Sequence, residues 1–116
     1  MERNLDLIRD ILLALESRST YSTPEKIAIE GYTHEEVDYH CRLLTDAGYI
    51  ISTSGGYNCF PIRMTDSGHD FLDASRDAGI WKKTKDFIAS KGVTVPLEIA
   101  KSLALEYLKK KLGMSN

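Results

Sequence analysis

The sequence is poor in cysteine and lacks any long apolar run, and these two absences restrict what the protein is. It contains two cysteines in 116 residues, with no C-x-x-C spacing, which argues against a disulfide framework. No stretch approaches the roughly 20 consecutive apolar residues of a membrane-spanning helix. The first residues do not have the layout of a signal peptide. We therefore expect a protein of the reducing cytoplasm that has no membrane partner.

The motifs of common enzyme sites are also missing. The glycine-rich segment 54–56 lacks the Lys-Ser/Thr that follows in a phosphate-binding loop. Cys41 has no evident base or cation nearby to produce a thiolate. Four side chains are of metal-binding types, namely His40, Cys41, Cys59 and His69. No pair of them has zinc-finger spacing. We expect neither catalysis, nor a bound metal, nor a cofactor.

The two parts of the chain are poor in charges of opposite sign: the first 80 residues have few cations, and the remaining residues have few anions. Residues 1–80 contain 7 Lys/Arg against 14 Asp/Glu, a net charge of −7, and residues 81–116 contain 8 against 3, a net charge of +5. The whole chain is at −2, so it has no global attraction to nucleic acid. The basic segment either attracts the acidic one within the molecule or binds an acidic partner.

The segment from Thr33 to Gly48 predicts an amphipathic helix. Thr33 and Glu36 match the capping box, in which each side chain accepts a hydrogen bond from the other residue's backbone N–H. One apolar stripe of the helix consists of Val37, Cys41 and Leu44. Gly48 can adopt the left-handed conformation that ends such a helix.

A β-hairpin is predicted to follow this helix. Two β-prone runs, 49–53 and 57–60, flank the turn residues Ser-Gly-Gly, and residues 61–64 complete the second strand. A helix followed by a hairpin is typical of the second half of a winged helix. We predict an α+β fold with a winged helix-turn-helix-like domain at 1–80 and a C-terminal helical extension at 81–116.

Apolar spacing predicts the remaining elements of the chain. The expected helices are 4–17, a helix that Thr65 caps and that Gly79 interrupts after about Ala78, then 80–90 and 97–112. Residues 27–29 alternate as in a short strand, although a helical turn opened by Pro24 is the alternative. In either case little room is left for the full-length middle helix of a helix-turn-helix.

Two segments resemble bacterial winged-helix repressors. Residues 37–50 are similar to their recognition helix and the following strand, with the pattern His-apolar-x-x-Leu-x-x-Ala-Gly-apolar-apolar from His40 onward. Residues 64–72 resemble the Leu-Thr-x-x-Gly-x-x-Phe-Leu that follows the wing. With residues 29–32 and 76–85 included, the chain resembles a family of small bacterial and prophage proteins that contains a domain of unknown function. This resemblance implies a fold but no established activity.

Two functions are compatible with this pattern. As a DNA-binding transcriptional regulator, the protein would contact DNA with His34, Tyr39, Arg42 and the wing residue Tyr57. Residues 34–47 have a net charge of −3, so we expect that binding to be weak and salt-sensitive. The alternative is a module that presents its acidic face to a protein, for example a phage protein that binds or inhibits a host protein.

The C-terminal extension raises two further questions. Trp81, with Lys82, Lys83 and Lys85 near it, either stacks on nucleic acid or anchors the extension in a core. The last helix is apolar over an arc wider than one packing surface needs. We therefore expect a homodimer whose interface includes Ile99, Leu103, Leu105 and Tyr107, the alternative being that the extension folds back on its own chain.

Overall fold

The computed structural model describes residues 1–19, 24–56 and 58–114. Contacts divide the chain into two compact units, Met1–Asp70 (unit 1) and Phe71–Asn116 (unit 2). The described residues form five helices and one antiparallel two-stranded sheet, a mixed α+β arrangement. No helix among them has the length and hydropathy to cross a membrane. The division into domains at residue 80 remains a prediction, because contacts do not test independent folding.

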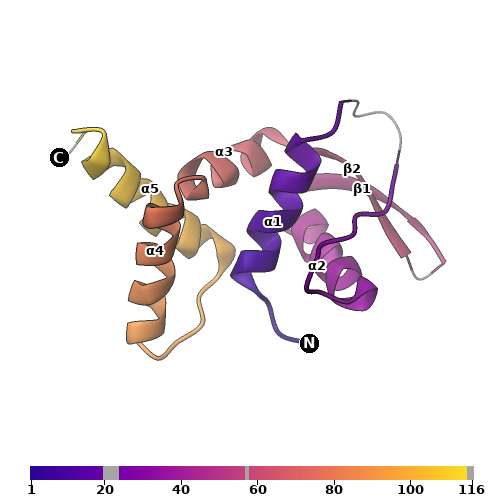
Figure 1. The fold of residues 1–116 in the computed structure, drawn as a ribbon, viewed down its shortest axis with the longest axis horizontal. Helices are drawn as coiled ribbons and strands as arrows, with labels where there is room; N and C mark the ends of the chain where they lie inside the picture. Colours follow the sequence, from indigo (N-terminus) through magenta and orange to yellow (C-terminus); the bar gives the residue numbers. More distant parts are fainter. Residues whose placement is uncertain (20–23, 57, 115–116) are drawn as a thin grey trace. The chain divides into compact units, whose positions relative to one another are not determined.

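Unit 1 consists of two helices packed on a β-hairpin (Figure 1). Helix α1 is Leu5–Glu16, α2 is His34–Asp46, and the strands are β1, Ile50–Gly55, and β2, Asn58–Met64. The predicted helix 4–17 is confirmed within one residue at each end, because Asn4 caps it by accepting from the Leu7 N–H at 3.1 Å. The core of unit 1 lies where α1, α2 and the hairpin meet.

The predicted helix is confirmed in detail. The hairpin is confirmed with a later turn than predicted, because β1 continues to Gly55 and pairs it with Asn58. Thr33 Oγ1 accepts from the Glu36 N–H at 3.1 Å, and a Glu36 carboxylate oxygen accepts from the Thr33 N–H at 2.9 Å. Val37, Cys41 and Leu44 are buried. Gly48 has a φ of +82°, the left-handed conformation expected where the helix ends.

The start of α3 (Asp66–Ser75) is fixed to the connection between α2 and β1. Thr65 Oγ1 accepts from the Gly68 N–H at 3.1 Å, which confirms the predicted cap, and donates to the Gly48 carbonyl at 2.6 Å. The backbones approach so closely that a Cβ on Gly68 would lie 2.1 Å from the Tyr49 carbonyl oxygen. Only glycine fits at this position without a backbone shift.

The strand predicted at 27–29 is wrong, and the helical turn after Pro24 is absent as well. The reason lies in the outer edge of β2, the edge that is not paired with β1. Pro61 has no N–H to donate to a third strand, and its carbonyl accepts from the Glu25 N–H at 3.4 Å and from Arg18 Nη1 at 2.7 Å. Segment 24–33 therefore follows this edge as irregular chain. The full-length middle helix of a helix-turn-helix is missing from its described part, as the sequence indicated.

Unit 2 contains the end of α3, then α4 (Ala78–Ser90) and α5 (Leu97–Lys111). Helix α3 ends at Ser75, three residues before the predicted end, and Gly79 lies inside α4 rather than at a break. The break falls at residues 76–77, because the Asp77 carboxylate caps α4 by accepting from the Ile80 N–H at 3.0 Å. This cap outweighs the weak helix propensity of a glycine in the first turn.

Trp81 belongs to the core of unit 2. It is 3% exposed, and its ring meets the Phe71 ring edge-on with a centroid distance of 6.1 Å. A smaller apolar cluster consists of Ala74, Ile80 and Ala104, with Tyr107 and Leu108 packed against it. The anchoring role predicted for Trp81 is confirmed, and stacking of its ring on a nucleic acid base is excluded by its burial.

The outer residues of α5 remain uncovered within the chain. Ile99 is 53% exposed and Leu105 37% exposed, whereas Leu103 and Tyr107 are half-buried. Ile99 and Leu105 are six residues apart, so they project about 120° from each other around the helix. A single partner helix would cover one of these two flanks, and the homodimer remains a prediction.

Candidate nucleic-acid interface

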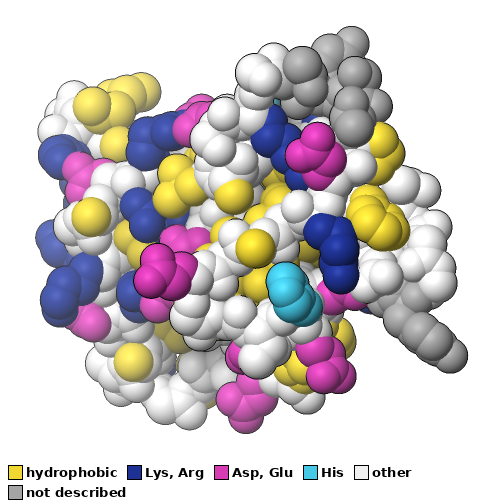
Figure 2. All heavy atoms as spheres, turned by 45° about the vertical axis from the view of Figure 1, so that its right-hand side comes forward, with side chains coloured by type: hydrophobic (Ala, Val, Ile, Leu, Met, Phe, Trp, Pro, Cys, Tyr) yellow, Lys and Arg dark blue, Asp and Glu magenta, His cyan; other side chains and the backbone are white. Residues whose placement is uncertain are grey.

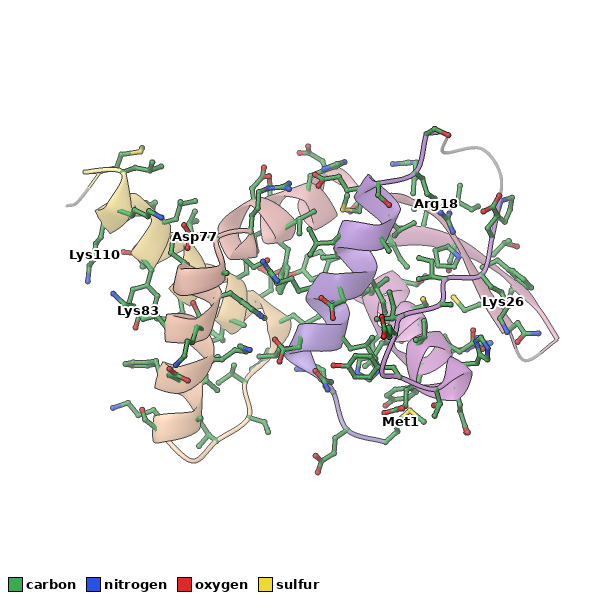
Figure 3. The ribbon with its side chains drawn as sticks, in the orientation of Figure 1. Met1, Arg18, Lys26, Asp77, Lys83 and Lys110 are labelled. Carbon is green, nitrogen blue, oxygen red and sulfur yellow. The ribbon has the colours of Figure 1, made fainter. Side chains whose placement is uncertain are left out.

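An open groove of about 490 Å³ runs along the exposed side of α2 in unit 1. Three of the four predicted contact residues line it, namely His34, Tyr39 and Arg42. The other lining residues are Met1, Lys26, Glu35, Asp38 and Asn58. Figure 3 shows Met1 and Lys26 on the side of unit 1 where α2 lies. Tyr57, the fourth predicted contact, lies outside the described residues.

The helical repeat places these side chains on one face. His34, Asp38 and Arg42 recur every four residues, so they form a row along α2. Tyr39 stands beside this row and is 38% exposed. The buried stripe of α2 packs against α1 and the hairpin, so the row lies on its flank. Tyr39 and Arg42 are the side chains that point away from this stripe most directly.

His40 supports the groove from behind instead of lining it. Its Nδ1–H donates to the Glu36 carbonyl at 2.8 Å, and its Nε2 accepts from the Asn4 N–H at 2.8 Å. The ring is buried and meets the Tyr39 ring edge-on, with 5.7 Å between centroids. Through these two hydrogen bonds the side chain fixes the start of α1 to α2.

Asp38 has a structural role that the sequence did not indicate. Its Oδ1 accepts from the Cys59 N–H on the outer edge of β2 at 2.9 Å. That bond ties α2 to the hairpin and gives the edge N–H an acceptor. Asp38 thus borders the groove with part of its carboxylate already engaged.

Two residues of the groove were missed by the sequence analysis. Lys26, from the irregular segment, donates from Nζ to Asn58 Oδ1 at 2.7 Å, across 32 positions of sequence. Lys26 lies in a stretch without periodicity, so no local signal places it near α2. Asn58 directly follows the predicted contact Tyr57 in the sequence, and this adjacency was the signal from which it could have been predicted.

The charges in the groove are balanced. Lys26 and Arg42 supply two cations, and Glu35 and Asp38 two anions. Glu36 adds a carboxylate nearby, whose pKa is lowered mainly by hydrogen bonds from the backbone and side chain of Thr33, so it is ionised at neutral pH. Figure 2 shows acidic and basic side chains interspersed on the face that it presents. The groove is thus less acidic than α2 alone predicts.

The two cysteines form no reactive site. Both are free and buried, and Cys41 occupies the apolar stripe as predicted. Burial, together with the nearby Cys59 and Asp38, raises the pKa of the Cys41 thiol to about 12, so it is protonated at neutral pH and is neither a nucleophile nor a ready metal ligand. Within the described ranges, no three His, Cys, Asp or Glu residues are grouped closely enough to hold a metal.

Comparison with known proteins shows the family. Residues 2–94 match the family described as "Hypothetical protein (DUF2513)". The chain belongs to this family. A relative from Haemophilus influenzae, described as an uncharacterized protein, is 36% identical over 111 residues, which cover 90% of this chain and 92% of the relative. No solved structure matches the chain. The family match spans unit 1 and α4 and ends in the connection before α5.

Proposed function

We propose that unit 1 is a winged-helix domain that binds duplex DNA with α2 and acts in transcriptional regulation. The supporting observation is the groove itself, which brings His34, Tyr39 and Arg42 together beside the hairpin that would be the wing. In winged-helix and helix-turn-helix proteins the recognition helix enters the major groove, and its exposed side chains contact base edges. The exposed row of α2 offers such side chains.

The side chains of the groove match base edges better than they match phosphates. Arg42 has the fork of donors that pairs with the two acceptors of a guanine, and the Asn58 amide suits an adenine. The Glu35 carboxylate can accept from a cytosine amino group. Lys26, at the rim, is the side chain available to a phosphate. These assignments predict sequence-dependent binding with little non-specific component from unit 1.

Affinity through this face should be low. Unit 1 contains six Lys/Arg against twelve Asp/Glu, a net charge of −6. Phosphate neutralisation supplies most of the sequence-independent affinity for DNA, so unit 1 gains little from it. We expect weak, salt-sensitive binding that becomes measurable on a preferred sequence.

The test selects a preferred duplex from a random pool with the full chain and measures its affinity by fluorescence anisotropy. Arg42→Ala should weaken that complex by about 1–3 kcal/mol if the side chain pairs with a guanine. Arg63→Ala is the matched control, because Arg63 lies on β2 outside the groove and donates to the Met64 carbonyl at 3.2 Å. Equal affinities of both variants and the wild type would show that α2 does not read DNA.

The charge of unit 1 favours a second candidate, a protein-docking module for a basic surface, such as a host protein bound by a phage protein. Glu35 and Asp46 are exposed on α2, and Glu35→Gln with Asp46→Asn removes both charges. For a DNA reader this change lowers phosphate repulsion and strengthens non-specific binding to a duplex of arbitrary sequence. For a protein-docking face it weakens capture of the partner in a pull-down from the host, so the two functions predict opposite signs.

A further inference from the structure

Unit 2 has a basic pocket of its own, about 550 Å³ in volume and open to solvent, between the start of α4 and the end of α5. Three lysines line it, namely Lys83, Lys110 and Lys111, together with Asp77, Gly79, Ile80 and Tyr107. In Figure 3, Lys83 of α4 and Lys110 of α5 project on the same side of the helical pair. The two helices thus bring lysines 27 positions apart to one surface.

The pocket keeps excess positive charge after its internal pairings are considered. Lys111 forms an ion pair with Asp77, the residue that caps α4. Lys83 lies over the Tyr107 ring, with its Nζ 5.2 Å from the centroid, and both Lys83 and Lys110 are exposed. Three ammonium groups against one carboxylate leave the pocket at +2. The whole of unit 2 is at +4, with nine Lys/Arg against five Asp/Glu, and Figure 2 shows Lys and Arg side chains gathered over this part of the chain.

We propose that this pocket binds the phosphate backbone of duplex nucleic acid, with Lys83 and Lys110 each contacting a phosphate regardless of base sequence. Lysine ammonium groups act as point charges, which suits phosphate oxygens and supplies no base discrimination. The site lies in the other unit from the groove on α2, and the proposal does not rest on sequence reading by that groove.

The aromatic residues of unit 2 favour a duplex over a single strand. Proteins that hold single strands stack the bases on exposed aromatic rings. Here Trp81 is buried, and Tyr107 is half-buried with Lys83 over its ring. No stacking platform is therefore present in the pocket. The aliphatic side chain that lines the pocket, Ile80, is itself buried, so the pocket has no apolar residue of its own to insert into a lipid surface. Leu112 and Met114, which follow the pocket lysines in the chain, are exposed, so the experiment includes lipid vesicles.

The experiment measures binding of the full chain to a fluorescein-labelled 20-base-pair duplex of arbitrary sequence, by anisotropy at several salt concentrations. Lys83→Gln with Lys110→Gln removes both proposed contacts. The matched control is Lys82→Gln with Lys101→Gln, which removes the same charge from the same two helices outside the pocket. Circular dichroism establishes that both variants retain the helical content of the wild type.

Each phosphate contact contributes about 0.9 to the slope of log K against log salt concentration. The pocket variant should therefore lower the magnitude of this slope by about 1.8 and weaken binding on the order of 50-fold at 0.1 M salt. The control should change affinity by less than about threefold, as expected for charges outside the pocket that contact no phosphate.

Equal losses in the two variants would overturn the proposal, because they would show that total charge matters and the pocket does not. Absence of duplex binding by the wild type at 50 mM salt would also overturn it, as would binding to phosphatidylserine vesicles without binding to the duplex. If the pocket variant binds normally while Arg42→Ala loses the selected duplex, the pocket proposal fails and the function proposed for α2 stands.

Discussion

The two units differ in how they combine shape and charge. Unit 1 has a helix beside a hairpin, the shape that we propose reads DNA, but it has a net charge of −6. Unit 2 is a plain pair of helices after the end of α3, yet it is at +4. The comparison teaches that the unit with the familiar shape is not the unit with the positive charge, so shape and charge require separate tests.

The units also differ in how closely neighbouring segments pack around a helical glycine. Gly68 in unit 1 and Gly79 in unit 2 allow a direct comparison. Gly68→Ala would place a Cβ 2.1 Å from the Tyr49 carbonyl, and a backbone oxygen cannot move as a side chain does. We expect a loss of about 2–4 kcal/mol in the free energy of unfolding, measured with urea. Gly79→Ala in unit 2 meets only an Asp77 side-chain oxygen at 3.2 Å, which needs to shift by only a few tenths of an ångström, so its effect should be within about 1 kcal/mol. Similar losses at both positions would contradict this distinction.

The exposed apolar residues of α5 test whether unit 2 is complete within one chain. We expect a homodimer at micromolar concentration, because burying a leucine side chain contributes about 1.5–3 kcal/mol. Leu105→Glu should shift the species in size-exclusion chromatography with light scattering from dimer to monomer. Leu105→Met is the control, since it keeps the surface apolar. A wild type that is already monomeric would show that the uncovered flank of α5 is no interface.

The smallest expected effect is a pH-dependent change in melting temperature. Lys111, and then the Ile80 N–H, lower the pKa of Asp77 below its ordinary value. The Asp77 carboxylate therefore stabilises the folded state at pH values above its ordinary pKa, and this contribution disappears as the pH falls through its lowered pKa. Asp77→Asn keeps an acceptor at the cap but removes the charge, so the melting temperature should fall slightly at pH 7 and match the wild type at the most acidic pH. An equal difference at all pH values would show that the charge is not responsible.

Signals within a few residues of sequence predicted much of unit 1. The Thr33–Glu36 box, the glycine at 48 and the hairpin all depend on neighbours in the chain, so spacing alone indicates them. The helix ends predicted in unit 2 were less accurate, because the capping residue Asp77 and Gly79 lie only two residues apart. Both are signals for a helix boundary, and only the hydrogen bond to Ile80 shows which one acts.

The part of the groove that was missed depends on contacts across long separations. Lys26 meets Asn58, and Asp38 meets the Cys59 backbone, 32 and 21 positions apart. Neither the hydrophobic pattern nor the capping residues of a sequence indicate which loop will contact a hairpin. His34, Tyr39 and Arg42 were found because they share one helix, whereas their neighbours from other elements required the folded chain.

The outer edge of β2 has a consequence for assembly. An open strand edge is a template on which another chain can add a strand, as in β-augmentation and in fibrils. Here the donor at Cys59 is bound by Asp38, and residue 61 has no donor to offer. Arg18 also holds the adjoining segment in place through the Glu25 carbonyl at 2.7 Å. An added strand would have to displace Asp38 from the Cys59 N–H and the Glu25 segment from Arg18, and it would find no donor at Pro61. Addition of a strand is therefore blocked at this edge.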